Sequence, residues 1–189
     1  MLNRSVVGMF LAGFLCSAYA DDSAEALAET CYSCHGANGV SVKPDIPSIG
    51  GQPETYIKRV LLEWKNGTRH SPTMAGMVGG YSEEQIGMLA AHFAKKPWVP
   101  AQQNVDASQV ELGRVVSERC SGCHGETGAA NDGRTPNING QWAQYLQLEL
   151  NEYRDDSEPL PNKQMRKVAK KLSEEEIKAV TAFFASQSK

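Results

Sequence analysis

Four of the five cysteines in this 189-residue chain lie in two copies of one short motif, Cys-x-x-Cys-His, at residues 31–35 and 120–124. This spacing is the sequence signal for covalent attachment of haem c. Two thiols bond to the vinyl groups of the porphyrin, and the histidine that follows is held under the iron. The sequence therefore predicts two covalently bound haem c groups, attached through Cys31, Cys34, Cys120 and Cys123, with His35 and His124 as axial iron ligands.

Three other chemistries use paired cysteines: a zinc site, a redox dithiol and a structural disulfide. A zinc site gathers four ligands, whereas each copy of the motif offers two cysteines and one histidine. A redox dithiol is expected in an α/β context, and no segment shows the alternation of a β-strand. Haem attachment is therefore the preferred interpretation.

The motif belongs to a duplication of the chain. Pro-Ser-Ile-Gly-Gly-Gln at 47–52 matches Pro-Asn-Ile-Asn-Gly-Gln at 136–141, at the same offset of 89 residues as the cysteine motifs. Ser-Glu-Glu-x-Ile recurs at 82–86 and 173–177, at an offset of 91, so the second copy carries two extra residues. We predict a signal peptide at 1–20, a first domain at 21–98, a linker at 99–106 and a second domain at 107–189.

The duplication also selects the sixth iron ligand. Met74 and Met165 each lie seven residues before the position that precedes the repeated serine, and these methionines superpose. Met77 aligns with Val168 and is kept as an alternative in the first domain. Met88 aligns with an alanine, and the other candidates, His70 and His92, have no histidine counterpart in the second copy. We therefore predict that Met74 and Met165 are the second axial ligands. Histidine–methionine ligation raises the iron potential and fills both axial positions, which favours electron transfer over ligand binding.

Two prolines are candidates to orient the axial histidines. A ligating histidine normally donates its other N–H to a carbonyl group. Pro47 and Pro136 each lie twelve residues after the histidine of their own motif, so their carbonyls are the expected acceptors. Tyr56 and Tyr145 also superpose, and they either reach the haem propionates or serve as ordinary helix aromatics.

Helices must position all of these groups. Segments before each cysteine motif and after each Gly-Gln are largely free of glycine and proline, and each repeated serine opens a capping box followed by apolar residues at helical spacing. We expect an all-α fold with about three helices per domain. A domain this small has a thin core, which a wrapped haem would complete.

The amino terminus has the layout of a secretory signal peptide, with Arg4, an apolar run over 6–15 and a small-x-small cleavage site that ends at Ala20. Cleavage there predicts an exported protein. The alternatives are a retained anchor, for which the run is short, and lipidation of Cys16. A net charge of −3 argues against nucleic-acid binding, and no second apolar run offers stable membrane insertion.

The chain resembles class I cytochromes c of the two-haem type. The shared pattern is Cys-x-x-Cys-His-Gly, Pro…Gly-Gln…Tyr, a methionine and Ser-Glu-Glu-x-Ile, and it spans the mature chain. Residues 140–147 and 153–154 are similar to the cytochrome subunit of flavocytochrome c sulfide dehydrogenase. Asn-Gly-Thr-Arg at 66–69 is similar to cytochrome c4, but Asp-Asp-Ser-Glu replaces it at 155–158.

The resemblance implies two tandem domains related by a pseudo-twofold axis, with their haem propionate edges facing each other. It implies an electron-transfer protein rather than an enzyme, located in the periplasm of a bacterium. We expect first the cytochrome subunit of flavocytochrome c sulfide dehydrogenase, in which a flavoprotein (FAD) subunit would supply the electrons and a soluble acceptor would take them. A cytochrome c4-like shuttle would instead deliver them to a membrane oxidase. A haem peroxidase or ligand sensor is the remaining alternative, and it requires one iron to lack its methionine.

One charge cluster surrounds the second methionine. It consists of Lys163, Arg166, Lys167, Lys170 and Lys171. Such a cluster is either a solvated helix face or a docking patch for an acidic partner.

Overall fold

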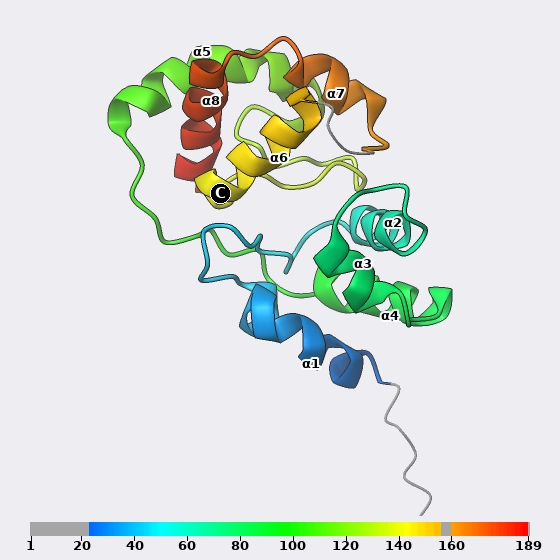
Figure 1. Cartoon of the computed structure of the whole chain (residues 1–189). Helices are drawn as coiled ribbons and strands as arrows, with labels where there is room; N and C mark the ends of the chain where they lie inside the picture. The colour runs from blue at the N-terminus through cyan, green and yellow to red at the C-terminus, as the bar shows by residue number, and fades with distance from the viewer. Residues whose placement is uncertain (1–22, 156–159, 189) are drawn as a thin grey trace, which may run out of the picture.

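The computed structural model describes residues 23–155 and 160–188, and all regular elements in these ranges are helical. The predicted signal peptide lies outside the described residues. The first half contains α1 (Ala24–His35), the 3-10 turn η1 (Ala37–Gly39), α2 (Glu54–Lys65), α3 (Pro72–Val78) and α4 (Glu83–Ala94). The second half contains α5 (Ala107–His124), α6 (Ala143–Asp155), α7 (Lys163–Ala169) and α8 (Glu174–Ser186). The two halves lie one above the other (Figure 1).

Each half contains the three expected helices and one further short helix. Side-chain caps explain these extra helices, α3 and α7. The Ser71 hydroxyl accepts a hydrogen bond from the Met74 N–H, and Pro72 stands in the first turn, where its missing N–H costs nothing. The Asn162 side chain accepts from the N–H groups of Gln164 and Met165. The expected capping boxes of α4 and α8 are confirmed, because both reciprocal hydrogen bonds are present at Ser82 and Ser173.

Each half has its own apolar core. In the first half α4 packs against α1 and α2, and Ile86, Leu89 and Phe93 of α4 are almost fully buried. In the second half α8 packs against α5 and α6 through Val180, Phe183 and Phe184. The last helix of each half is therefore the centre of its core.

The crossing of α5 and α8 is especially close. A Cβ atom at Gly113 would overlap the Ala179 carbonyl oxygen, so only glycine allows the two backbones to approach so closely. This contact explains the one glycine in a helical segment that otherwise lacks helix breakers.

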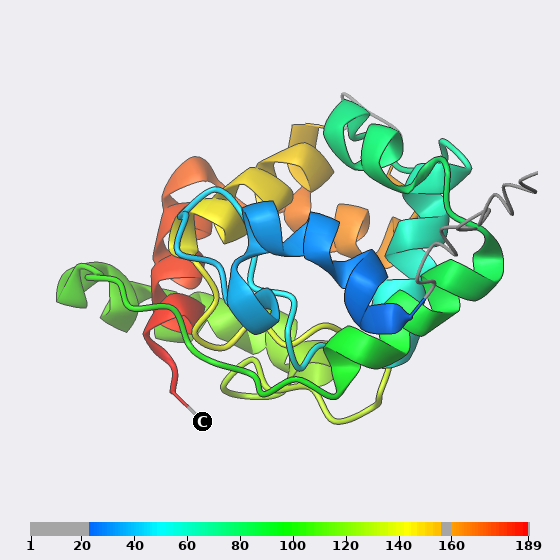
Figure 2. The ribbon, with the colours of Figure 1, turned by 90° about the horizontal axis from the view of Figure 1, so that it is seen from below.

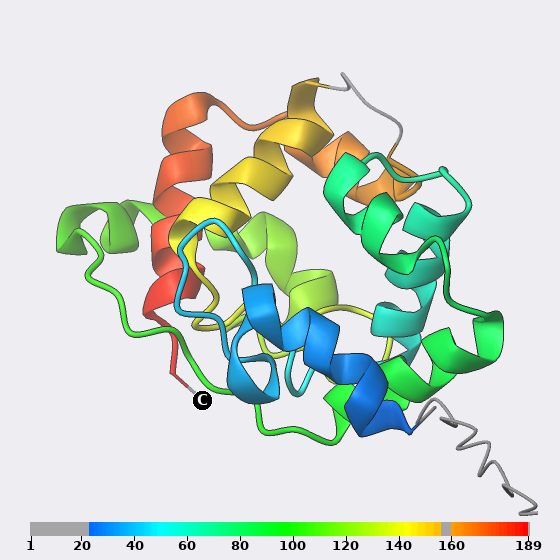
Figure 3. The ribbon, with the colours of Figure 1, turned by 60° about the horizontal axis from the view of Figure 1, so that its bottom comes forward.

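The segment between α4 and α5 runs along one side of the molecule and passes the carboxyl end of α8 (Figures 2 and 3). It is attached to the second half before α5 begins. The Trp98 indole N–H donates to the Asn139 carbonyl at 2.9 Å, and the Ala101 N–H donates to the Gly140 carbonyl at 2.7 Å. The linker is thus part of the contact between the halves.

Two glutamine side chains at equivalent positions form hydrogen bonds between the halves. Gln141 accepts a hydrogen bond from the Ser48 N–H at 3.0 Å and donates to the Ser48 carbonyl at 2.9 Å. Gln52 makes the same pair of bonds with the backbone of Asn137, both at 2.8 Å. Ser48 and Asn137 also superpose in the duplication, so the interface repeats itself about a pseudo-twofold axis.

Candidate haem sites

Each Cys-x-x-Cys-His motif forms the last turn of a helix. In α1 this turn carries Cys31, which is half-buried, Cys34, which is exposed, and His35. Gly36 ends the helix with φ +75°, and a Cβ there would overlap the Val40 carbonyl oxygen. In α5 the sequence repeats this arrangement, and Gly125 ends the helix with φ +76°. The helical turn therefore brings both thiols and the histidine to one end of each helix.

Each predicted axial histidine has a carbonyl partner on one ring nitrogen. His35 Nδ1 lies 2.8 Å from the Pro47 carbonyl oxygen, and His124 Nδ1 lies 3.2 Å from that of Pro136. Burial lowers the pKa of both histidines below the ordinary value, against the opposing effect of the carbonyl hydrogen bond. Each ring is therefore neutral at pH 7, with its proton on Nδ1 and the lone pair of Nε2 available to a metal.

The thiols do not have the properties of a redox dithiol. Burial raises the pKa of Cys31 to about 11 and that of Cys120 to about 11. Redox-active Cys-x-x-Cys pairs instead have a lowered pKa that maintains a thiolate. Within the described ranges, no three acidic, cysteine or histidine side chains gather as a metal-ion site would require.

The two predicted methionine ligands occupy the same place in the two short helices. Each is the third residue of its helix, and its backbone N–H bonds to the cap side chain, at 3.2 Å for Met74 and 3.1 Å for Met165. Met74 is half-buried and packs on the same core cluster as Cys31. Met165 packs against Tyr153, Leu160 and Ala169.

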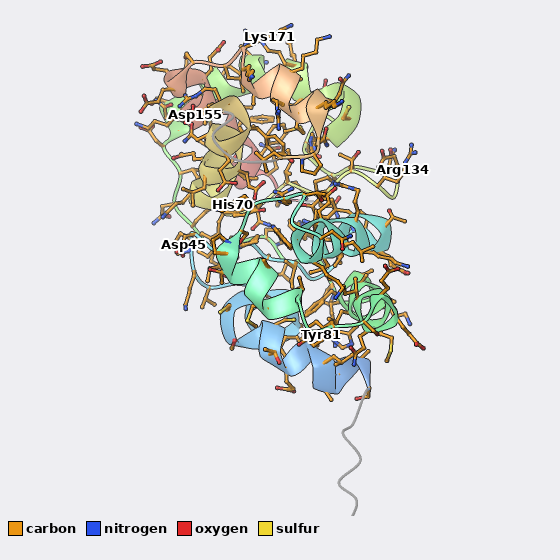
Figure 4. All side chains as sticks on the ribbon, turned by 45° about the vertical axis from the view of Figure 1, so that its right-hand side comes forward. Asp45, His70, Tyr81, Arg134, Asp155 and Lys171 are labelled. Atoms are coloured by element: carbon orange, nitrogen blue, oxygen red, sulfur yellow. The ribbon has the colours of Figure 1, made fainter. Side chains whose placement is uncertain are left out.

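The alternative ligands are placed differently. Met77 lies on α3 but is 36% exposed. Met88 and His92 lie on α4 and line a shallow surface pocket with Glu25 of α1. His70 is exposed in the loop between α2 and α3 (Figure 4).

A buried arginine, Arg69, lies between the halves, and no sequence motif marked it as part of the site. Arg69 follows α2 and is only 4% exposed. Its guanidinium lies 2.6 Å from Glu149 Oε2 on α6, and it donates to the Tyr153 hydroxyl at 3.3 Å. It also lies over the rings of Trp64 and Tyr153, which superpose in the duplication. Burial opposes the charge of Arg69, but Glu149 and the neighbouring tyrosines together raise its pKa, so the guanidinium stays charged.

Tyr56 and Tyr145 lie in the same region. Burial, followed by the negative charge of Glu149, raises the pKa of both hydroxyls well above the ordinary value. Both tyrosines are therefore uncharged hydroxyl donors at physiological pH. The pair lies beside Arg69, whose positive charge offsets part of this rise in both pKa values.

The residues present fit a covalent haem in each half. Each motif presents two thiols and a histidine whose Nε2 is not used by the Pro47 or Pro136 hydrogen bond. The Trp64 indole N–H is buried without an acceptor among the described residues, in the same core cluster as Met74. A haem carries carboxylate acceptors of the kind that such a donor needs.

The basic cluster of the second half lies on and just after α7. Lys163, Lys167, Lys170 and Lys171 are exposed, and Arg166 is half-buried with its guanidinium on the Leu160 carbonyl. Lys171 lies at the end of the second half that is remote from the first (Figure 4). The charges thus lie on the exposed surface around α7, the helix that carries Met165.

Comparison with known proteins gives a consistent family. The cytochrome c family model matches residues 110–188. Cytochrome c4 of Azotobacter vinelandii is 30% identical over 208 residues, covering 96% of this chain and 98% of the relative. The cytochrome subunit of sulfide dehydrogenase of Chlorobaculum tepidum is 41% identical over 69 residues, covering 36% of this chain and 62% of the relative. The crystal structure of reduced recombinant cytochrome c4 from Pseudomonas stutzeri aligns with a TM-score of 0.79 at 27% identity, over 88% of this chain and 99% of that structure.

The similarity covers both halves of the chain, and the helical fold and the two motifs agree with it. The chain therefore belongs to the cytochrome c family, among the dihaem class I cytochromes that include cytochrome c4, and it carries two covalently bound haem c groups.

Proposed function

We propose that this protein is an electron carrier in which each iron is held by one histidine and one methionine, His35 with Met74 and His124 with Met165. The observation that carries this proposal is the matched position of the methionines. Each is the third residue of a capped seven-residue helix, downstream of a buried and neutral histidine.

This ligand set suits electron transfer rather than catalysis. When bound, the haem supplies one-electron chemistry. Met74 and Met165 contribute uncharged thioethers that favour the reduced iron, and each histidine contributes a neutral ring fixed by its proline carbonyl. With both axial positions filled, no position stays open for oxygen or peroxide, which opposes the peroxidase and sensor alternatives.

For the pathway we favour a free carrier between a dehydrogenase and a terminal oxidase, because the similarity to cytochrome c4 extends over nearly the whole chain. The second candidate is the cytochrome subunit of a flavoprotein sulfide dehydrogenase. The higher identity of the sulfide dehydrogenase relative supports it, although over 69 residues only.

The basic cluster of α7 is the proposed docking surface for an acidic partner. Like charges concentrated around one redox site raise the rate of encounter with a partner of opposite charge. Because the cluster surrounds Met165, electrons would enter or leave through the second haem.

The proposed location is the periplasm, after cleavage behind Ala20. The layout of residues 1–20 supports this location. In the described part of the chain no helix is long and apolar enough to cross a bilayer.

Replacement of the methionines tests the ligand assignment. We expect Met74→Leu and Met165→Leu each to abolish half of the long-wavelength absorption of methionine-bound ferric haem, and to let one reduced iron bind carbon monoxide. The control Met77→Leu should leave both properties unchanged. If Met77→Leu removes the absorption and Met74→Leu does not, the assignment in the first domain is wrong.

Isolation of the untagged protein from its native periplasm separates the two pathways. Flavin that co-elutes at about one per two haems would identify the subunit of a flavoprotein complex. Haem without flavin, on a particle the size of this chain alone, would identify the free carrier.

A further inference from the structure

The two interface glutamines contact the peptide groups that hold the axial histidines. The Pro47 carbonyl accepts from His35, and the N–H of the same peptide group, on Ser48, donates to Gln141 Oε1. In the second half the Pro136 carbonyl accepts from His124, and the Asn137 N–H donates to Gln52 Oε1. Each histidine is thus linked through one peptide to a glutamine of the opposite domain.

In each half the histidine and the glutamine bond to the same peptide group. In a trans peptide the C=O and N–H groups point in opposite directions, and the described residues contain no cis peptide bond. The histidine and the glutamine therefore bond to opposite ends of one polarisable unit. Ser48, Gln52 and Gln141 are 3%, 4% and 2% exposed, so water screens these bonds little.

A hydrogen bond at one end of a peptide strengthens the bond at the other end. When Gln141 Oε1 accepts from the Ser48 N–H, the Pro47 oxygen becomes more negative and a better acceptor for the His35 proton. A histidine that donates a stronger bond is a more electron-rich ligand. A more electron-rich ligand favours ferric iron and lowers the reduction potential of its haem.

We propose that Gln141 and Gln52 are positioning residues that set the electron affinity of the haem in the opposite domain, so that docking of the two domains tunes both redox centres. This inference rests on the proposed axial roles of His35 and His124. It makes the interface a control element for the direction of electron flow, in addition to a structural contact.

The crossed pattern gives a selective test in the full-length dihaem protein. Gln141→Met removes both bonds to Ser48 at nearly constant side-chain volume. We expect the equilibrium constant for reduction of the first haem to rise by up to about twofold, from a change of about 10–30% in a hydrogen bond between neutral groups. The second haem should be unaffected. Gln52→Met should produce the reciprocal pattern.

Two readouts are needed, the potential of each haem and the NMR signal of each axial histidine Nδ1–H in the reduced protein. We expect the His35 proton signal to move upfield in Gln141→Met and the His124 signal to move upfield in Gln52→Met. The matched control is Gln103→Met, because Gln103 makes two bonds of 2.9 Å between the linker and the second half, to the Gln141 carbonyl and the Ala143 N–H, without touching a peptide next to an axial histidine. It should shift neither signal.

A purely structural role for the glutamines predicts a different result. A loosened interface admits water, which stabilises ferric haem and lowers both potentials together in either variant. That outcome, or unchanged proton signals, would overturn the proposal. If Gln141→Met and Gln52→Met both open the interface, a third variant, Gln141→Glu, tests the link. Its carboxylate is a stronger acceptor, so the His35 proton signal must move downfield, and an unmoved signal refutes the link.

Failure of the axial assignment is distinguishable from failure of this inference. If His35 or His124 does not ligate iron, its ring signals lack the displacement caused by the haem in the unsubstituted protein. If only the glutamine link is wrong, those displaced signals are present and do not respond to substitution.

Discussion

The helices that carry Met74 and Met165 have the same length, and the methionine is the third residue of each, yet the surface of α3 is uncharged and that of α7 is cationic. Helix α3, Pro72–Val78, contains no charged residue, and Met77 is exposed on it. Helix α7, Lys163–Ala169, contains three cationic residues and is followed directly by Lys170 and Lys171. The buried register of the two helices is alike while the outer face differs, which is the pattern expected if the two haems have different neighbours in electron transfer.

The contact between the halves shows a second difference. The glutamine bonds repeat in both directions, whereas within residues 23–155 and 160–188 the ion pair runs in one direction. Arg69 comes from the first half and reaches Glu149 of the second. The reciprocal pair of glutamines therefore accounts for the symmetry of the interface, and Arg69 adds an ion pair to it.

Removal of one cysteine pair should have the largest effect, because it removes the haem of one half and leaves the other half as the comparison. Cys31→Ala/Cys34→Ala should leave one haem per chain instead of two, because the thioether bonds are the covalent attachment. Cys120→Ala/Cys123→Ala should do the same for the second half. Haem quantified per chain as the pyridine complex is the measurement. Two haems in either double variant would contradict the assignment.

Loss of the arginine that bridges the halves should be the next largest effect. We expect Arg69→Met to lower the free energy of unfolding by roughly 2–4 kcal/mol, because the Glu149 side chain, which is only 22% exposed, loses its cationic partner. Arg59→Met is the control. The Arg59 side chain is 41% exposed, and its partner Glu63 keeps a second cation, Arg69, at 4.0 Å, so this replacement should cost less than about 1 kcal/mol.

Denaturant titration of both variants measures this difference. A double variant, Arg69→Met/Glu149→Met, should recover part of the loss, because no unpaired charge is left. Equal costs for the Arg69 and Arg59 variants would show that the pair between the halves contributes no more than a surface contact.

Charge reversal on α7 tests the difference between the two methionine helices. We expect Lys167→Glu/Lys170→Glu to slow oxidation by the anion ferricyanide about tenfold at low salt, and the effect should fade as salt screens the charges. Lys43→Glu/Lys58→Glu reverses two exposed lysines of the first half and serves as the control. Stopped-flow rates that respond equally to both double variants would deny the cluster a special role.

The smallest expected effect concerns pH. His92 occupies the position of Phe183 in the duplication, and it lies 2.7 Å from the Tyr32 hydroxyl, near Glu25, Lys95 and Lys96. Burial, followed by the charge of Lys96, lowers the pKa of His92 below its ordinary value of 6.5. The unfolded chain therefore binds more protons, and stability falls as the pH drops below about 6.5.

Replacement by the residue of the second half tests this difference. His92→Phe should reduce the loss of stability at low pH by roughly 0.5 kcal/mol. Unfolding free energies at pH 7 and pH 5 provide the measurement, and His70→Phe is the control because His70 is exposed. An unchanged pH dependence in His92→Phe would assign the loss to another group.

Local sequence was sufficient to predict the longer helices, α1, α2, α4, α5, α6 and α8, and to select the candidate ligands. Cap residues, helical spacing and the Cys-x-x-Cys-His motif act within one or two turns of chain, so their signals can be read without knowledge of the fold. The short helices α3 and α7 were missed because seven residues give too little apolar periodicity. The serine–proline pair and the asparagine before them were the available signals.

By itself the sequence determined that the chain is duplicated, that its fold is all-helical and that it carries two covalent haems, and it predicted a histidine and a methionine in each copy as the iron ligands. Only the tertiary structure decided which groups meet between the copies. Gln141 and Ser48 are 93 positions apart, and Arg69 and Glu149 are 80 apart. No local pattern marks such partners, because their contact depends on how two separately formed cores pack, and that is set by the shape and burial of whole surfaces.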